Sequence, residues 1–199
     1  EIVTEPDIRS PQEAYAYLVK LKQILQYVEV CTGDMEKGHL RCDANVSVRP
    51  IGRSQFGVKT ELKNMNSFKA VERAITFEIE RQVKVVRNGG AVVQQTLLWD
   101  ESRRVAEAMR SKEESHDYRY FPEPDLANLV VDEKWLADLR TGLPELPDAR
   151  AERLEKEYDI PGYDARTLTD SRALATYYEA VARAVNDGKF ASNWIMGEL

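Results

Sequence analysis

The chain has few residues of the kinds that hold soft metals. Among its 199 residues there are two cysteines, Cys31 and Cys42, and two histidines, His39 and His116. These are too few for a zinc site or a histidine cluster and form no CxxC pair, so reduced thiols are expected. No apolar run approaches the length of a membrane span, and no signal-peptide pattern is visible. The sequence therefore predicts a cytoplasmic protein without a membrane partner.

Charge is unevenly spread along a chain of otherwise ordinary globular composition, with 43% hydrophobic and 31% charged residues. The net charge is −6, but residues 37–87 hold eleven Lys and Arg against five Asp and Glu, a local charge of +6. A basic region on an acidic body is typical of a protein that binds a phosphate-rich ligand at one place. The alternative is that these charges are scattered over helix and strand surfaces.

Residues 39–64 carry the most informative pattern, because two stretches alternate between apolar and polar side chains. In 40–48 the even positions are apolar, and in 56–62 the even positions again hold the apolar side, with Lys59, Glu61 and Lys63 opposite them. Residues 50–54 supply a turn. This period of two predicts an antiparallel hairpin with one buried and one polar face.

The hairpin can pair in two registers. With a short loop Asp43 lies directly across from Glu61; with a loop two residues longer Asp43 faces Lys63 and Glu61 faces Asn45. A slip by one residue is excluded, because it would turn the apolar side chains to the wrong face. In both registers the two carboxylates are cross-strand neighbours about 5–8 Å apart.

Two carboxylates that close repel each other unless a cation lies between them. Mg²⁺ is usually held by one or two carboxylates together with water and substrate phosphates. The side chains around the pair suit phosphate oxygens and are all basic: Arg41, Arg49, Lys59 and Lys63. The pattern therefore predicts a face for Mg²⁺–nucleotide binding or phosphoryl transfer. The alternative is a solvated face of interleaved salt bridges.

The remaining patterns of the first 130 residues predict an α+β layer with a mostly antiparallel sheet and helices packed on it. A capping box at 10–13 begins an amphipathic helix over 11–29. Ser67 begins a second helix that ends at 88–90, and a second hairpin is expected from 91–99 and 104–111. The apolar face of the second helix is expected at Phe68, Val71, Ile75, Ile79, Val83 and Val86.

From residue 131 the sequence predicts a small all-α domain, after a proline-bounded linker at 143–148. Helices are expected at 132–141, 148–157, 170–186 and 188–199. One apolar stripe is formed by Leu174, Tyr177, Tyr178, Val181 and Val185. Between the two regions, residues 115–125 contain Tyr118, Tyr120 and Phe121, which would either pack on the sheet or stack on a base with Arg119 contacting phosphate.

Several uncommon strings resemble the GatB family of bacterial and organellar tRNA-dependent amidotransferase subunits. They are EIVTEPDIRSPQEA, LRCDANVSVRP, GVKTELKNMNSF and SHDYRYFPEPDL, with a looser likeness in LPELPDAR and SNWIMG. The archaeal GatE-type, Gln-specific relative shares many of these sequence motifs. The resemblance implies that residues 1–130 are the C-terminal part of a catalytic cradle domain and residues 131–199 a truncated helical domain. An internal fragment of this kind is expected to be inactive alone.

The resemblance also implies an activity and its partners. The family is a ligase of protein biosynthesis that uses ATP and Mg²⁺ to phosphorylate the side-chain carboxylate of Glu-tRNA(Gln) or Asp-tRNA(Asn). Ammonia from a partner glutaminase then displaces phosphate. The implied partners are the two other members of a heterotrimer, the glutaminase (the A component) and a small protein (the C component), together with the misacylated tRNA. The glutaminase nucleophile is expected in the partner, since no Ser-Lys signature is visible in this chain.

The resemblance implies roles for seven residues of the hairpin. Asp43 and Glu61 match two acidic positions of the family's ATP–Mg²⁺ site and are expected to be catalytic metal ligands, with Lys63 as the third catalytic residue. The expected nucleotide-binding residues are Arg41 and Lys59, for phosphate, and Asn45 and Asn64, for water or the acyl group. Two other hypotheses remain: a non-catalytic tRNA-binding or scaffold module, and an unrelated metal-dependent hydrolase.

Overall fold

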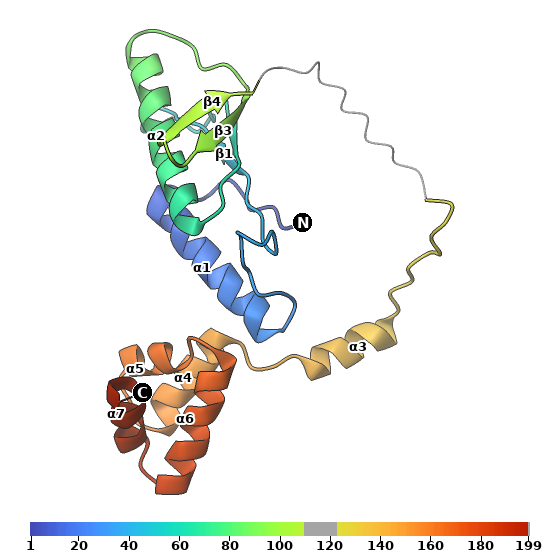
Figure 1. The fold of residues 1–199 in the computed structure, drawn as a ribbon, viewed down its shortest axis with the longest axis vertical. Helices are drawn as coiled ribbons and strands as arrows, with labels where there is room; N and C mark the ends of the chain where they lie inside the picture. Colours follow the sequence, from blue (N-terminus) through green and yellow to red (C-terminus); the bar gives the residue numbers. More distant parts are fainter. Residues whose placement is uncertain (110–122, 199) are drawn as a thin grey trace. The chain divides into compact units, whose positions relative to one another are not determined.

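The computed structural model describes residues 1–109 and 123–198 (Figure 1). The chain forms two compact units, residues 1–109 and residues 110–199. Residues 115–122 of the predicted aromatic loop lie outside the described residues, so its proposed packing or stacking stays a prediction. The predicted domain boundary at residue 130 likewise stays a prediction.

The first unit is an α+β layer, as predicted. Its elements are α1 (Pro11–Tyr27), β1 (Ala44–Val46), β2 (Thr60–Lys63), α2 (Phe68–Arg87), β3 (Thr96–Asp100) and β4 (Val105–Ala108). The strands lie in the order β1-β2-β3-β4. The β1–β2 and β3–β4 pairs are antiparallel, and the β2–β3 pair is parallel because α2 carries the chain back across the sheet. The sheet is therefore mixed, with two predicted hairpins flanking a parallel pair.

The first helix begins as the sequence predicts but ends earlier. The Ser10 hydroxyl accepts a hydrogen bond from the Glu13 amide (3.1 Å), and Pro11 occupies the first turn. The Glu13 carboxylate accepts from the Arg9 amide (2.6 Å) instead of from the Ser10 amide of a full capping box. The helix ends at Tyr27, and Glu29 follows it with a φ of 59°.

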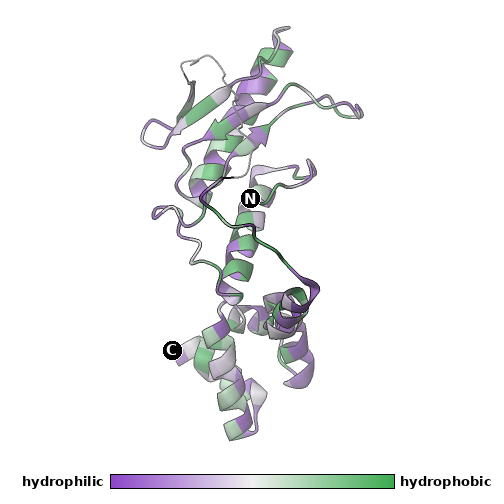
Figure 2. Ribbon diagram, turned by 90° about the vertical axis from the view of Figure 1, so that its right-hand side faces the viewer, coloured by the Kyte–Doolittle hydropathy of each residue, from purple (hydrophilic) through white to green (hydrophobic). Residues whose placement is uncertain are grey.

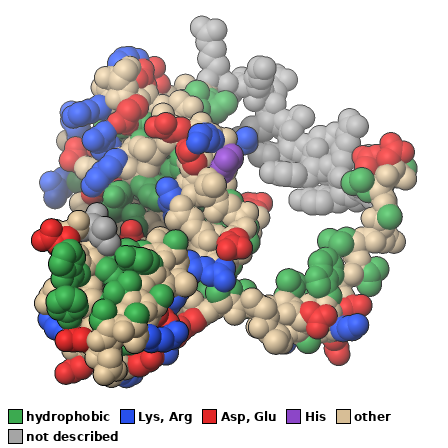
Figure 3. All heavy atoms as spheres, turned by 60° about the horizontal axis from the view of Figure 1, so that its bottom comes forward, with side chains coloured by type: hydrophobic (Ala, Val, Ile, Leu, Met, Phe, Trp, Pro, Cys, Tyr) green, Lys and Arg blue, Asp and Glu red, His purple; other side chains and the backbone are tan. Residues whose placement is uncertain are grey.

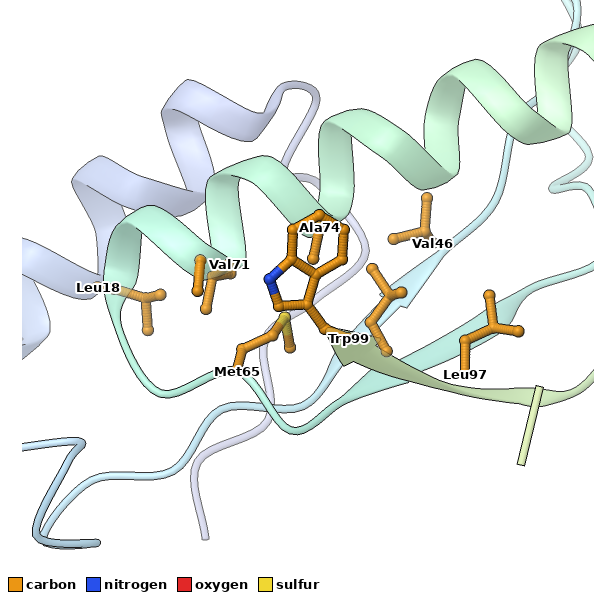
Figure 4. Close-up of a cluster of buried hydrophobic side chains, with 9 residues drawn as sticks. Leu18, Val46, Met65, Val71, Ala74, Leu97 and Trp99 are labelled. Carbon is orange, nitrogen blue, oxygen red and sulfur yellow. The ribbon is translucent and has the colours of Figure 1, made fainter. Parts of the chain in front are cut away.

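The core of this unit lies between α2 and one face of the sheet, with α1 contributing from the side (Figure 4). The indole of Trp99 reaches from β3 toward α2 and is only 2% exposed. Phe77 of α2 meets the indole edge-on, with 6.0 Å between ring centroids. The buried residues are Leu18, Val46, Leu62, Met65, Ala70, Val71, Ala74, Leu97 and Trp99.

The predicted buried face of α2 is wrong at its C-terminal half. The buried residues are Ala70, Val71, Ala74, Glu78 and Gln82. Of the predicted face, Val71 is buried, but Val86 is 46% exposed. The sheet lies against a polar part of the helix because Glu78 and Gln82 form hydrogen bonds with strand groups there.

The predicted apolar side of the second hairpin strand is also partly wrong. Thr60 and Leu62 are buried, but Phe56 and Val58 are 52% and 48% exposed. The paired ladder of β1 and β2 ends at Val46 and Thr60. Residues before Thr60 therefore leave the sheet and lose its cover.

Every described element of the second unit is a helix. These are α3 (Glu133–Gly142), α4 (Pro147–Glu157), α5 (Gly162–Leu168), α6 (Arg172–Val185) and α7 (Gly188–Glu198). The sequence predicted four of them and missed α5. Figure 2 shows hydrophilic and hydrophobic residues interleaved along these helices. No helix in the described part of the chain is long and apolar enough to cross a membrane.

The core of the second unit packs alanines together with Leu and Ile side chains around Tyr178; its buried residues are Ala151, Leu154, Ile160, Ala165, Leu168, Tyr178, Ala182, Ala191 and Ile195. Tyr178 is fully buried, and Ala175 and Ala182 lie one turn before and after it on α6. Tyr177 and Val185 of the predicted stripe are instead 50% and 45% exposed. The buried face of α6 is therefore formed by Ala175, Tyr178, Glu179 and Ala182 and is rotated away from Tyr177 and Val185. Figure 3 shows other hydrophobic side chains of this unit at its surface.

Candidate functional site

Asn45, Glu61 and Lys63 alternate along their strands with the buried Val46, Thr60 and Leu62, so they lie on the face of the sheet opposite α2. Asn45 of β1 pairs with Glu61 of β2, and Glu61 pairs in turn with Thr96 of β3. This is the longer-loop register of the two that the sequence allowed. It leaves Asp43 beside Lys63 and diagonal to Glu61. We call this surface the outer face of the sheet.

Lys63 lies between the two predicted metal-binding carboxylates. Its Nζ atom is 3.4 Å from Asp43 Oδ2 and 3.4 Å from Glu61 Oε1. The side chains of Lys63, Asp43 and Glu61 are 39%, 51% and 34% exposed, so this ion-pair triad is open to solvent. Desolvation lowers the pKa of Lys63, but the charges of Asp43 and Glu61 outweigh it and the pKa is raised. The two carboxylates therefore converge on one cation.

Glu61 is additionally held from the neighbouring strand. The Thr96 hydroxyl donates a hydrogen bond to Glu61 Oε2 (2.9 Å), while Lys63 lies near Oε1. The sequence analysis missed Thr96, because it reaches Glu61 only through the parallel pairing that α2 makes possible. A threonine in the first strand after the crossover is the only signal that the sequence offers for it.

The other predicted site residues do not join this triad. Asn45 is exposed opposite Glu61. Arg41 and Lys59 are exposed, and among the described residues neither forms an ion pair with the two carboxylates. Asn64 has a φ of 69°, a conformation that asparagine tolerates, and its side-chain amide donates to the Trp99 carbonyl (3.0 Å). The amide of Asn64 therefore ties the end of β2 to the end of β3.

A second polar cluster, which the sequence analysis missed, lies on the inner face of the same strands. The carboxylate of Glu78 is fully buried and accepts hydrogen bonds from the Thr60 hydroxyl (2.7 Å) and from Arg81 (2.7 and 2.8 Å). Burial raises the pKa of Glu78, but the hydrogen bonds from Arg81, Thr60 and Gln82 outweigh burial and the pKa is lowered.

Gln82 joins this cluster to the backbone of the hairpin. Its amide nitrogen lies 2.9 Å from the Val46 carbonyl, 3.0 Å from Thr60 Oγ1 and 2.8 Å from Glu78 Oε1. Its amide oxygen accepts from the Val48 amide (3.1 Å). Gln82 thus pairs with β1 where the ladder to β2 stops, and it accepts from the Val48 amide, which lies beyond that ladder. The inner cluster therefore fixes the strands that present Asp43 and Glu61.

Asp43 and Glu61 are the residues of the outer face that could hold a hard divalent cation. Carboxylate oxygens are the ligands that Mg²⁺ prefers, and two carboxylates already converge on one positive charge. No group of three or more His, Cys, Asp or Glu side chains in the described ranges is placed to hold a metal ion. The donor set therefore fits a cation that takes its remaining ligands from water and phosphate oxygens. In such a site Lys63 would have to move from between the carboxylates.

Comparison with known proteins places the chain in a family. The family "GatB/GatE catalytic domain" matches residues 1–137. The B component of the aspartyl/glutamyl-tRNA(Asn/Gln) amidotransferase of Moorella thermoacetica is 57% identical over 199 residues, and that of Carboxydothermus hydrogenoformans 55%. Both similarities cover the whole chain, but only 42% and 41% of the relatives' lengths. The chain thus spans about two fifths of the curated relatives that it matches. Because the family match extends over more than half of its residues, the chain belongs to the GatB/GatE catalytic-domain family.

Proposed function

We propose that this chain is part of the ATP-dependent component of a tRNA-dependent amidotransferase. In this proposal the protein phosphorylates the side-chain carboxylate of Glu-tRNA(Gln) or Asp-tRNA(Asn), and ammonia from a partner glutaminase then displaces phosphate. Family membership supports the reaction class. The observation that carries the site is the convergence of Asp43 and Glu61 on one cation at an exposed face of the sheet.

The reaction requires a negatively charged nucleophile to approach a triphosphate. A carboxylate is a poor acyl donor and an acyl phosphate is a good one. Cleavage of ATP in the first step therefore activates the carboxylate for attack by ammonia. The side-chain carboxylate of the substrate attacks the γ-phosphorus, the bond to the β-phosphate oxygen breaks, and ADP leaves. Ammonia then attacks the acyl carbon and releases inorganic phosphate. The first step needs charge neutralisation and in-line positioning.

The residues of the outer face have different roles in this first step. Asp43 and Glu61 hold Mg²⁺, which neutralises phosphate charge when bound. Thr96 keeps one oxygen of Glu61 occupied and leaves the other, which faces Lys63, for the cation. Lys63, Arg41 and Lys59 contact phosphate oxygens, and the exposed amide of Asn45 lies beside Glu61 to orient water or the acyl group.

One observation favours a second candidate, a tRNA-binding or scaffold module without ATP chemistry. Lys63 already neutralises both carboxylates, so the outer face is complete as an ordinary ion-pair network. In that case the triad stabilises the hairpin, and divalent cations and nucleotide are not needed.

The test compares carboxylate variants of the native protein purified with its partner proteins. Asp43→Asn and Glu61→Gln are expected to lower tRNA-dependent ATP cleavage by about 100-fold or more, because each removes a ligand that acts on transition-state charge. Affinity for tRNA should be largely retained. The measurement is ADP release with and without misacylated tRNA at saturating Mg²⁺.

Glu107→Gln is the matched control. Glu107 is an exposed carboxylate on β4 that pairs with Arg103 (2.6 Å) and does not contact Asp43 or Glu61. Its variant should keep full activity. Full activity in both Asp43→Asn and Glu61→Gln would refute the proposed mechanism and favour the scaffold candidate, and ATP cleavage that is independent of tRNA would favour a simple hydrolase.

A further inference from the structure

The loop that joins β1 to β2 is an exposed surface separate from the carboxylate triad. We call residues 47–59 the basic loop. Between Ala44 and Thr60 the chain has three cations, Arg49, Arg53 and Lys59, and no Asp or Glu. Every residue from 49 to 59 is exposed. A solvated run of one charge sign is an interaction surface only if the segment is ordered and its charges have no acidic partner within the protein.

The basic loop is ordered by its own contacts. The guanidinium of Arg49 lies over the ring of Phe56, 4.7 Å from its centroid, and donates to the Ser54 carbonyl. The Arg53 amide donates to the Pro50 carbonyl (3.2 Å), closing a turn. Gly57 lies against Val48, where an added Cβ would come within 2.2 Å of the Val48 carbonyl oxygen. These contacts hold Phe56 at the surface with one ring face against a cation.

Two cations of the loop differ from most of those on β2 and α2 in having no acidic partner. On β2 and α2, Lys63, Lys69, Arg73 and Arg81 all form ion pairs with carboxylates. Within the described ranges Arg53 and Lys59 form none. The loop therefore keeps a positive potential that ion pairs have neutralised over much of β2 and α2.

The loop is also continuous with the outer face. Lys59 precedes Glu61 by two residues, so the alternation of an extended chain places both side chains on the same face, about 7 Å apart. In the proposed function the reacting carboxylate is attached to the end of an RNA chain. When that carboxylate reaches Asp43 and Glu61, the phosphates next to it must pass close to the site.

We propose that the basic loop binds the single-stranded acceptor end of the tRNA. Arg53 and Lys59 contact its phosphates, and Phe56 offers its edge and open side to an unstacked base. Single-stranded RNA is the partner that needs both a cation track and an aromatic surface. This inference rests on the proposed function and names the surface by which its substrate is held.

The test measures the affinity of the native protein, purified with its partner proteins, for tRNA by fluorescence anisotropy over a series of salt concentrations. The double variant Arg53→Glu/Lys59→Glu should weaken binding about tenfold or more near 0.1 M salt. Because it removes two phosphate contacts, the slope of log K against log salt should become shallower by about one to two. Phe56→Ala should weaken binding at least about fivefold, and Phe56→Tyr should restore it.

Lys84→Glu is the matched control, because Lys84 is an exposed cation on α2, which covers the other face of the sheet. It should leave the affinity for tRNA unchanged. Unchanged affinity and slope in the double variant would overturn the inference. Loss of a partner protein with unchanged tRNA affinity would also overturn it, because the loop would then be a protein interface.

The two proposals fail in different ways. The single variants Arg53→Glu and Phe56→Ala, which keep Lys59, should retain near-normal ATP cleavage at saturating tRNA, whereas Asp43→Asn should lose cleavage and retain affinity. Normal tRNA affinity in the loop variants with an inactive Asp43→Asn refutes the loop alone. Weak binding in the loop variants with a fully active Asp43→Asn refutes the carboxylate mechanism alone.

Discussion

Adjacent residues of β2 take part in two similar clusters on opposite faces of the sheet. On the outer face, the carboxylate of Glu61 is bound by a threonine hydroxyl and a lysine. On the inner face, Thr60 is the hydroxyl that binds the carboxylate of Glu78, together with an arginine and a glutamine. The chemical groups are nearly the same, and the main difference is access to water.

Access to water decides what each cluster can do. Glu78 is fully buried, so water cannot take the place of a hydrogen-bond partner that is removed from its carboxylate. Glu61 is one-third exposed and so is its cation, so one positive charge can be exchanged for another at little cost. We therefore expect the inner cluster to stabilise the fold and the outer cluster to bind ligands. Variants of each cluster test this division, from the largest expected effect to the smallest.

The strongest test compares alanine variants of the two carboxylates. Glu78→Ala should lower the free energy of unfolding by about 3 kcal/mol, because Arg81, Thr60 and Gln82 lose a shared buried partner. Glu61→Ala should change it by less than about 1 kcal/mol. Urea unfolding followed by tryptophan fluorescence measures both, since Trp99 lies in the same core. Equal losses would show that the two faces do not differ as proposed.

A smaller effect is expected where the inner cluster meets the backbone. Gln82→Ala should cost about 2 kcal/mol, because it removes the acceptor of the Val48 amide and a donor to the Val46 carbonyl. Hydrogen exchange of the Val48 amide should accelerate at the same time. Gln55→Ala, in the exposed basic loop, is the matched control and should change neither quantity. Unchanged exchange at Val48 in Gln82→Ala would contradict the role assigned to Gln82.

The sequence predicted the outer cluster better than the inner one, and the reason is physical. Alternation along 40–48 and 56–62 identifies which side chains face away from the core, so Asp43, Asn45, Glu61 and Lys63 could be placed together. It could not choose between the two registers, because loops that differ by two residues keep the same faces. The observed register depends on the turn and on the pairing of Gln82 with β1, which alternation does not report.

The periodicity of apolar residues in the sequence did not indicate the inner cluster. A helical pattern treats Glu78 and Gln82 as solvent-facing residues, so the predicted face was drawn through Ile75, Ile79 and Val83 instead. The structure shows that polar residues on α2 are buried because the short β1–β2 ladder leaves strand groups for them to bind. Thr96 was missed for a related reason, since a parallel pairing joins residues whose proximity no local pattern encodes.

Acid should weaken the inner cluster less than alanine does, because a protonated Glu78 keeps its shape and part of its hydrogen bonding. The pKa of Glu78 is lowered in the folded protein, so its stabilisation is present above the unfolded-state pKa and is lost as the pH falls through the folded one. The free energy of unfolding should therefore fall below about pH 4.5. Glu78→Gln should show a shallower fall in urea titrations at several pH values, and identical slopes would contradict the shift.

The smallest effect on stability, and the most direct test of exchangeable charge, is expected at Lys63. Lys63→Met should change the free energy of unfolding by less than about 0.5 kcal/mol, because exposed ion pairs contribute little. It should nevertheless tighten the binding of Mn²⁺ alone, measured by calorimetry, because the two carboxylates lose the ammonium that competes for them. Asp43→Asn in the same background should abolish that gain. If Mn²⁺ binding does not respond to Lys63, the outer face holds its charges as firmly as the inner face does, and the division between the two clusters fails.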